Sequence, residues 1–359
     1  MTTMHVRRVE LAGALGCALW ACGEDVGGSG TGTGDGANLE FGQVTGVAED
    51  SWLMSTWAPN AQVAFAVGGV VDRDDRTGRG VMLRRDGSGW SEVALPADTP
   101  MLNWVYGFGE DDVWVVGELG TALHWDGSGW QAHDTGTDQT LWGVWGSAPD
   151  DLWAVGGGGF TAGPPEPTAI RWNGTEWSEQ PLPALSPSTV EQLFKVWGRS
   201  ADEVYIVGMA GLVLRWDGSE LVQIPVPSDG DDWISLWGNS EELVLVGGRG
   251  GMQVSFHDGS EWRQIEDRFA GGINGVWTGS PGIAYASGER GSVWVIDLDG
   301  AELIRTIQLT EVQSARQDIL HAIFGQPGGR LVTVGGNLGG VIGQEVGYLF
   351  EANMGGMAR

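Results

Sequence analysis

The stretch from Leu141 to Glu179 decides the fold, because it is one copy of a repeated unit: LWGVWGSAPDDLWAVGGGG at 141–159, a variable insert, then AIRWNGTEWSE at 169–179. Two columns align the copies. The aromatic column contains Trp57, Tyr106, Trp145, Trp197, Trp237, Trp277 and Phe324. The glycine column contains Gly68, Gly117, Gly156, Gly208, Gly247, Gly288 and Gly335. The glycine follows the aromatic residue by 11 residues in six copies and by 10 in the fifth, so seven copies share a fixed core with variable spacers.

Each copy contains four short strands. In the quoted copy, apolar patterning predicts strands at 141–145, 152–155 and 169–172, and a fourth strand that begins at Trp177. The turn between the third and fourth strands carries an Asp-Gly or Asn-Gly pair, whose residues tolerate positive φ. These pairs lie at 86–87, 126–127, 173–174, 217–218, 258–259 and 299–300. A four-stranded antiparallel sheet repeated seven times predicts an all-β fold, a seven-bladed β-propeller.

The last copy lacks a fourth strand, because no Asp-Gly turn follows Tyr348-Leu349-Phe350. The segment NLEFGQVT at 38–45 alternates like a strand, so we expect it to pair beside 348–351 as the missing outer strand and close the ring. Such pairing removes two exposed sheet edges. The expected organisation is a signal peptide at 1–21, a flexible tether at 22–37 and the propeller at 38–359.

Two connections between second and third strands are enlarged. They are GVVDRDDRTGRG at 69–80 and GGGFTAGPPEPT at 157–168. Neither shows the apolar alternation of a strand, so both are predicted to be surface loops.

Charge and cysteine content narrow the function. The net charge of -28 disfavours binding to nucleic acid, because phosphate groups repel an acidic protein. Both cysteines, Cys17 and Cys22, lie in the N-terminal segment, so the body is expected to have no disulfide.

The N-terminal segment has the form of a targeting signal. Arg7 and Arg8 precede an apolar run at 11–21, which is too short to span a bilayer. Leu19-Trp20-Ala21-Cys22 resembles the lipobox of bacterial lipoproteins, which implies cleavage before Cys22 and lipid attachment to its thiol. The implied location is the bacterial cell envelope, with the outer membrane favoured and simple secretion as the alternative. The Gly/Ser/Thr-rich tract after Cys22 is a flexible tether.

The repeat itself resembles two known types. The elements DLWAVGG at 151–157 and WNGTEW at 172–177 resemble kelch repeats, and the turn that follows Asp126 resembles a shortened BNR, or Asp-box, turn. The resemblance covers residues 45–352 and is closest to bacterial repeat-propeller lipoproteins. It implies the fold and transfers no catalytic residue.

Most conspicuous side chains have a structural interpretation. Aromatic residues three positions before the column glycine are expected to pack between blades; they are Trp114, Trp153, Tyr205 and Tyr285. Tryptophans that open fourth strands are expected to be more exposed; they are Trp130, Trp177 and Trp262. The tyrosines occupy repeat positions, and no HExxH or GxSxG motif occurs, so we expect no catalytic set, no metal and no cofactor.

The two faces of the ring should differ. Acidic residues in the first-to-second turns should share a face with the Asp-Gly hairpins, which makes that face acidic. The opposite face carries the long loops and is the expected ligand face, because function concentrates on variable loops of a rigid scaffold. Its candidate contact residues are Arg73, Arg76, Arg79, Arg249 and Arg290.

The resulting hypothesis is a non-catalytic, surface-anchored propeller that acts as a monomeric scaffold for a protein or glycan ligand. It would touch the membrane only through its lipid anchor. The alternative is a carbohydrate-active hydrolase or lyase of the sialidase-like propeller type.

Overall fold

The computed structural model describes residues 39–46, 50–71, 78–159, 164–228, 230–247, 252–266, 269–309, 318–326, 329–337 and 346–354. All of them belong to one compact unit, Gly36–Arg359. The signal peptide, Cys22 and the tether predicted from the sequence lie outside the described residues. Across the ranges given, no helix combines the length and apolar character needed to cross a membrane.

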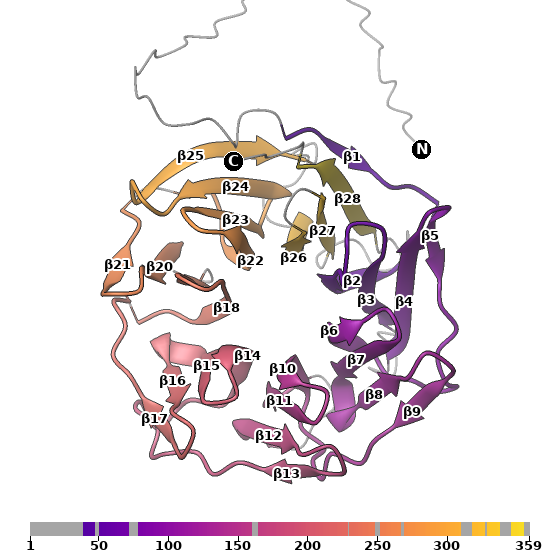
Figure 1. Cartoon of the computed structure of the whole chain (residues 1–359), viewed down its shortest axis with the longest axis horizontal. Coiled ribbons are helices and arrows are strands. Elements are labelled where there is room, and N and C mark those ends of the chain that lie inside the picture. The colour runs from indigo at the N-terminus through magenta and orange to yellow at the C-terminus, as the bar shows by residue number, and fades with distance from the viewer. Residues whose placement is uncertain are drawn as a thin grey trace, which may run out of the picture. The chain divides into compact units, whose positions relative to one another are not determined.

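Seven four-stranded antiparallel sheets, the blades, surround a central axis (Figure 1). The innermost strands are β2 (Trp52–Trp57), β6 (Leu102–Gly109), β10 (Leu141–Ala148), β14 (Leu193–Ser200), β18 (Trp233–Gly238), β22 (Ile273–Ser280) and β26 (Asp318–Gly325). The second strands are β3 (Ala64–Val71), β7 (Asp112–Gly117), β11 (Asp151–Gly156), β15 (Glu203–Gly208), β19 (Leu243–Gly247), β23 (Ile283–Gly288) and β27 (Arg330–Asn337). The third strands are β4 (Gly78–Asp86), β8 (Ala122–Trp125), β12 (Thr168–Trp172), β16 (Val213–Trp216), β20 (Gln253–His257), β24 (Ser292–Asp297) and β28 (Gly347–Asn353). The outer strands are β5 (Gly89–Glu92), β9 (Trp130–Ala132), β13 (Trp177–Glu179), β17 (Leu221–Gln223), β21 (Trp262–Gln264), β25 (Glu302–Gln308) and β1 (Phe41–Gln43). The predicted seven-bladed propeller is confirmed.

The N-terminal strand closes the ring as predicted. In Figure 1, β1 lies along β28 of the seventh blade. The register pairs Phe41 with Ala352 and Gln43 with Phe350. Just before β1, Leu39 is 4% exposed and belongs to an apolar core cluster that also contains Phe350 and Ala352 of β28. One sheet thus joins the two ends of the propeller.

Glu351 on β28 adds a side-chain link between the last blade and the first. One carboxylate oxygen lies 2.8 Å from Arg85 Nε and accepts a 2.8 Å hydrogen bond from the indole N–H of Trp90, both in the first blade. The other oxygen lies 2.9 Å from Arg330 Nη1 on β27. The Glu351 side chain is 14% exposed, so this link is largely shielded from solvent.

The core lies between neighbouring blades. Trp114, Trp153, Tyr205 and Tyr285 are all buried, which confirms their predicted packing role. The Trp153 ring, for example, lies 5.3 Å from the ring of Trp216 in the next blade. Every blade therefore completes its apolar core with its neighbour.

Two local predictions are wrong. Trp177 was expected to be exposed, yet it is 7% exposed, because its ring packs edge-on against Trp114 of the preceding blade at 5.7 Å. The segment 69–80 was expected to contain no strand, yet β3 and β4 extend into it and pair Gly69 with Gly80 and Val71 with Gly78. Backbone pairing on a long hairpin does not require apolar alternation. In the described part of 157–168, only Thr168 belongs to a strand, as predicted.

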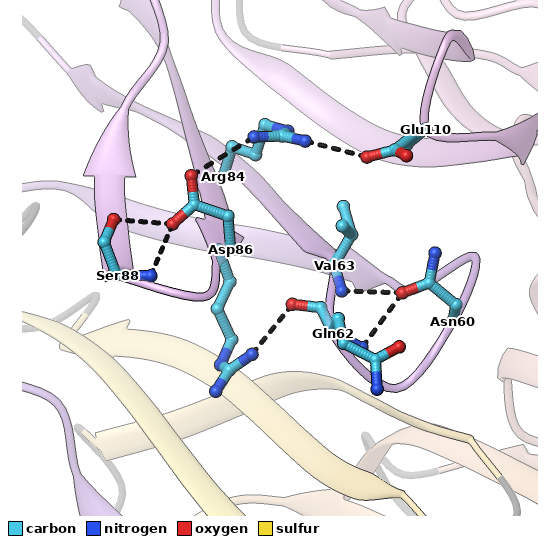
Figure 2. A network of polar contacts seen from close by, with 8 residues as sticks. Asn60, Gln62, Val63, Arg84, Asp86, Ser88 and Glu110 are labelled. Carbon is cyan, nitrogen blue, oxygen red and sulfur yellow. Dashed lines mark hydrogen bonds and ion pairs between the residues drawn. The ribbon is translucent and has the colours of Figure 1, made fainter.

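The acidic face, made by the first-to-second turns and the third-to-fourth hairpins, is observed as predicted. A Cβ atom on Gly174 of an Asn-Gly hairpin would lie 2.9 Å from Cβ of Asp150 in the first-to-second turn. Figure 2 shows the first of these hairpins, where Asp86 accepts hydrogen bonds from the backbone N–H and the hydroxyl of Ser88. These bonds lower the pKa of Asp86. In the same view Arg84 reaches Glu110 of the second blade at 2.9 Å.

Candidate functional site

A β-bulge in every innermost strand creates the candidate site. In each blade the pairing between the innermost and second strands skips one residue. The skipped residue lies three positions before the residue of the aromatic column. A bulge leaves its extra residue unpaired and changes which face the following residues occupy. The skipped residues are Met54, Asn103, Trp142, Phe194, Ile234, Asn274 and His321.

These seven residues, one from each blade, all line a single central cavity of about 400 Å³. Residues at the start of the innermost strands or just before them complete its wall, including Trp52, Met101, Gln192 and Ile319. The cavity therefore belongs to the loop face, the face opposite the acidic one, where the inner strands begin. Large apolar walls with a few polar groups are typical of small-ligand sites.

The glycine column lies opposite the bulges of the innermost strands. At each column glycine, a Cβ atom would lie 1.7–2.6 Å from a backbone carbonyl oxygen at the start of the paired inner strand. At Gly156, for example, the carbonyl oxygen is that of Thr140, at 1.9 Å. Only glycine fits where the bulge brings the two backbones together.

Two carboxylates enter the cavity from equivalent turns of the second and sixth blades. Glu118 and Glu289 each follow the column glycine directly, and both line the cavity. The next residue is left-handed in both turns, with φ 55 at Leu119 and φ 61 at Arg290. Glu118 is 5% exposed and accepts a 2.7 Å hydrogen bond from the Thr140 hydroxyl. Tight turns thus place both carboxylates in the wall of the cavity.

Lys195, the only lysine of the chain, lines the same cavity. It follows Phe194 in the fourth blade and reaches past the third blade to the second. Its Nζ donates a 2.5 Å hydrogen bond to the carbonyl of Trp142 and lies 4.2 Å from the ring centroid of Trp104. Gly143 leaves the space for this path, because a Cβ atom there would lie 3.1 Å from Lys195 Cα. Burial lowers the pKa of Lys195 from 10.5 to about 7, which outweighs the attraction of the aromatic ring for the cation.

A buried amide adds an unsatisfied acceptor to the wall. Asn103 is 1% exposed and donates to the carbonyl of Leu141 at 3.2 Å. Its Oδ1 atom has no hydrogen-bond partner within the described structure. A buried acceptor without a partner is costly, so a ligand that donates a hydrogen bond here would be favoured.

The residues of the aromatic column lie three positions after the bulged residues, closer to the acidic face. Their rings pack around the axis, with Trp57 5.9 Å from Tyr106 and Trp237 5.1 Å from Phe324. Trp237 and Phe324 belong to the fifth and seventh blades, so their rings meet inside the ring of blades, past the inner edge of the sixth blade. We call this layer the aromatic plug; none of its residues lines the cavity.

Of the five arginines predicted as ligand contacts, the two that the structure describes do not line the cavity. Arg79 on β4 is 3.5 Å from Glu92 of the same blade and its side chain is 64% exposed. Arg290 is half-buried in its tight turn in the sixth blade. The structure therefore does not bring these two together, and Arg73, Arg76 and Arg249 lie outside the described residues.

The tyrosines lie away from the cavity. The Tyr106 hydroxyl donates to the carbonyl of Gly146 at 3.0 Å, and that of Tyr348 donates to Asp318 at 3.0 Å. Among the residues with assigned positions, no tyrosine or arginine lines the cavity, and no cluster of three or more His, Cys, Asp or Glu could hold a metal ion.

Comparisons with known proteins agree on the fold. No protein-family profile and no curated protein matches the sequence. The chain is similar in structure to the WD40 β-propeller domain of Doa1, with TM-score 0.62 and 12% identity over 87% of this chain and 96% of that one. It is similar to YCF48 bound to a D1 peptide, with TM-score 0.59 and 15% identity over 89% and 96%. It is also similar to an inactive virginiamycin B lyase from Staphylococcus aureus with quinupristin, with TM-score 0.63 and 10% identity over 87% and 99%. The chain thus has a β-propeller repeat fold, which these three proteins share.

Proposed function

We propose that the protein is a non-catalytic binding propeller that takes one protruding group of a protein or glycan ligand into its central cavity. The observation that carries this proposal is that each blade contributes one bulged side chain to the same cavity. A volume of about 400 Å³ suits one sugar ring or one large side chain rather than a polymer. The rest of the ligand would lie across the loop face, where the predicted contact residues Arg79 and Arg290 are found.

The chemistry of the wall supports a ligand group with both apolar and polar parts. Trp52, Trp142 and Phe194 offer aromatic surface, and Asn103 and Asn274 offer amide groups. Aromatic surface combined with a few hydrogen-bonding groups is what a sugar ring or an aromatic side chain requires. The neighbour bound to a D1 peptide is consistent with a protein ligand.

Binding arrays test the proposal. The propeller body, residues 38–359, would be applied to glycan and peptide arrays, and every binder found would be measured again with two variants. Ile234→Trp fills the cavity, whereas Ile304→Trp makes the same change on the outer strand β25, where the residue is 49% exposed. We expect Ile304→Trp to bind like the unmodified protein and Ile234→Trp to bind at least about tenfold more weakly, as for a lost buried anchor. Equal binding by a folded Ile234→Trp protein would place the ligand elsewhere.

The proposal includes attachment to a bacterial envelope membrane, preferably the outer membrane, through a lipid on Cys22. Its support is the lipobox-like sequence followed by the flexible tether. Replacing Cys22 with serine should move the protein to the soluble fraction and abolish incorporation of labelled fatty acid. Continued incorporation after Cys22→Ser would rule out this attachment.

A hydrolase or lyase is the second candidate, because Glu118 and Glu289 line one cavity and could serve as a carboxylate pair. Multiple turnover of any array glycan, lost in Glu289→Gln, would establish this activity in place of simple binding. Turnover unaffected by Glu289→Gln would exclude this carboxylate pair as its origin.

A further inference from the structure

We propose that the cavity captures a small aldehyde with an apolar body and holds it as an imine on Lys195 Nζ. This inference rests on the proposed function only in taking the cavity as the ligand site. The inference goes beyond the proposed function in two ways. It names the ligand as an aldehyde, and it adds a covalent bond to Lys195.

The position of the amine is the first observation. Lys195 is the sole lysine among 359 residues of an acidic chain, and it lies in the wall of the central cavity rather than at the surface, where lysines are usually found. Its path depends on Gly143, which leaves room for the side chain to reach Trp104. Glycine at 143 and lysine at 195 together build a site that holds one amine at the cavity wall.

The surroundings of the amine make it nucleophilic. Its direct contacts are a carbonyl oxygen and an aromatic ring, and the charged or titratable residues that line the same cavity are Glu118, Glu289 and His321. Because burial lowers the pKa of Lys195 to about 7, a large share of the amine is neutral near neutral pH. A neutral, desolvated lysine amine is the form that attacks carbonyl carbon.

The reaction is balanced without any oxidant or reductant. The Nζ lone pair attacks the aldehyde carbon, the carbonyl π electrons move to oxygen, and a proton passes from nitrogen to oxygen to give a carbinolamine. The hydroxyl group and the second amine proton then leave as water, which forms the C=N bond. The apolar wall, including Trp142 and Phe194, would hold the body of the aldehyde.

Reductive labelling with hexanal and cyanoborohydride at pH 7 tests this inference on the full chain carrying Cys22→Ser, which cannot be lipid-modified at residue 22. The α-amino group serves as an internal reference, because its ordinary pKa is about 7.7–8.0 in the folded and the unfolded protein. Trypsin does not cleave after a labelled lysine. Labelling of Lys195 is therefore measured as the amount of one uncleaved peptide that runs from Trp172 to Arg199. We expect Lys195 in the folded protein to be labelled at least as fast as the α-amine.

Two controls separate cavity chemistry from ordinary amine reactivity. In 8 M urea the pKa of an exposed lysine returns to about 10.4, so the neutral fraction of Lys195 at pH 7 falls about 1,000-fold, and its labelling relative to the α-amine should fall at least about 100-fold. A long polyethylene glycol aldehyde, too large for the cavity, should label the α-amine only. Gly143→Ala should slow labelling of Lys195 by displacing its side chain.

The result that overturns the inference is labelling of Lys195 that is no faster in the folded protein than in urea. Labelling of folded Lys195 by the long polymer aldehyde would equally overturn it, because the amine would then lie outside a confined site. Failure here with ligand binding intact in the arrays would leave the proposed function standing. Selective labelling of Lys195 in a protein that binds nothing on the glycan and peptide arrays would support the aldehyde site but not the proposed function.

Discussion

Removing the closing strand should destabilise the whole propeller. A chain that begins at Gly46 instead of Asn38 loses β1, its pairing with β28, and the buried side chain of Leu39. Burial of a leucine side chain contributes about 2 kcal/mol, and the half-buried Phe41 and Val44 add about 1 kcal/mol each. The lost backbone hydrogen bonds contribute about 1 kcal/mol each, so the total loss is about 5 kcal/mol or more. This is a large fraction of the stability of a typical domain.

Thermal unfolding measures this loss. In a domain of this size about 1 kcal/mol corresponds to roughly 2 °C in Tm, so the chain that begins at Gly46 should melt about 10 °C below the chain that begins at Asn38. Leu39→Ala alone should lower Tm by about 4–8 °C, from a cost of about 2–4 kcal/mol. Glu40→Ala is the matched control, because Glu40 is exposed, and it should leave Tm unchanged. Melting temperatures within about 1 °C for the two truncated chains would refute the closure argument.

Three further predictions concern the ring and the cavity. Glu351→Gln should lower the free energy of unfolding by about 2–3 kcal/mol, because it weakens shielded links between the first and last blades. The control Glu92→Gln should leave the free energy of unfolding unchanged in the same thermal measurement, because the ion pair of Glu92 is solvent-exposed. Gly156→Ala should lower the free energy of unfolding by at least about 3 kcal/mol or prevent folding, since its Cβ would lie 1.9 Å from a carbonyl oxygen. The control Gly87→Ala should lower it by less than about 1 kcal/mol, because its Cβ would have no atom within 4 Å. Because burial lowers the pKa of Lys195 to about 7, the unfolded chain binds more protons between about 7 and the ordinary 10.5, so stability from this group should rise with pH in that window. Chemical denaturation at pH 7 and 9 should show a smaller rise for Lys195→Met, and an identical rise in both proteins would contradict the lowered pKa.

The architecture was readable from the sequence because the repeat fixed it. The spacing of the aromatic and glycine columns gave the number of blades, and the count of strands identified 38–45 as the closing segment. The acidic face followed from the alternation of turns along an antiparallel sheet. Trp177 was misjudged because strand position alone does not show how far the neighbouring blade covers the outer edge.

The cavity was not found from the sequence because a bulge reverses the alternation on which strand patterning depends. In a regular strand, residues three apart point to opposite faces, so Trp142 would not be expected to face the axis along with Trp145. Two signals mark the site in retrospect. The first signal is a glycine within a strand, which often accompanies a bulge. The second is that the residue three positions before the aromatic column changes in chemical type from blade to blade, for example from Met54 to Asn103 to His321.

The closing sheet also fixes when the fold can be completed. Synthesis proceeds from the N-terminus, so β1 emerges first and its partner β28 emerges last. Six blades can form from hairpins of consecutive strands, but the seventh needs a contact between the most distant parts of the propeller. Until then the growing chain carries an unpaired strand at each end. Until the seventh blade forms, these two strand edges are therefore exposed to pairing with another chain.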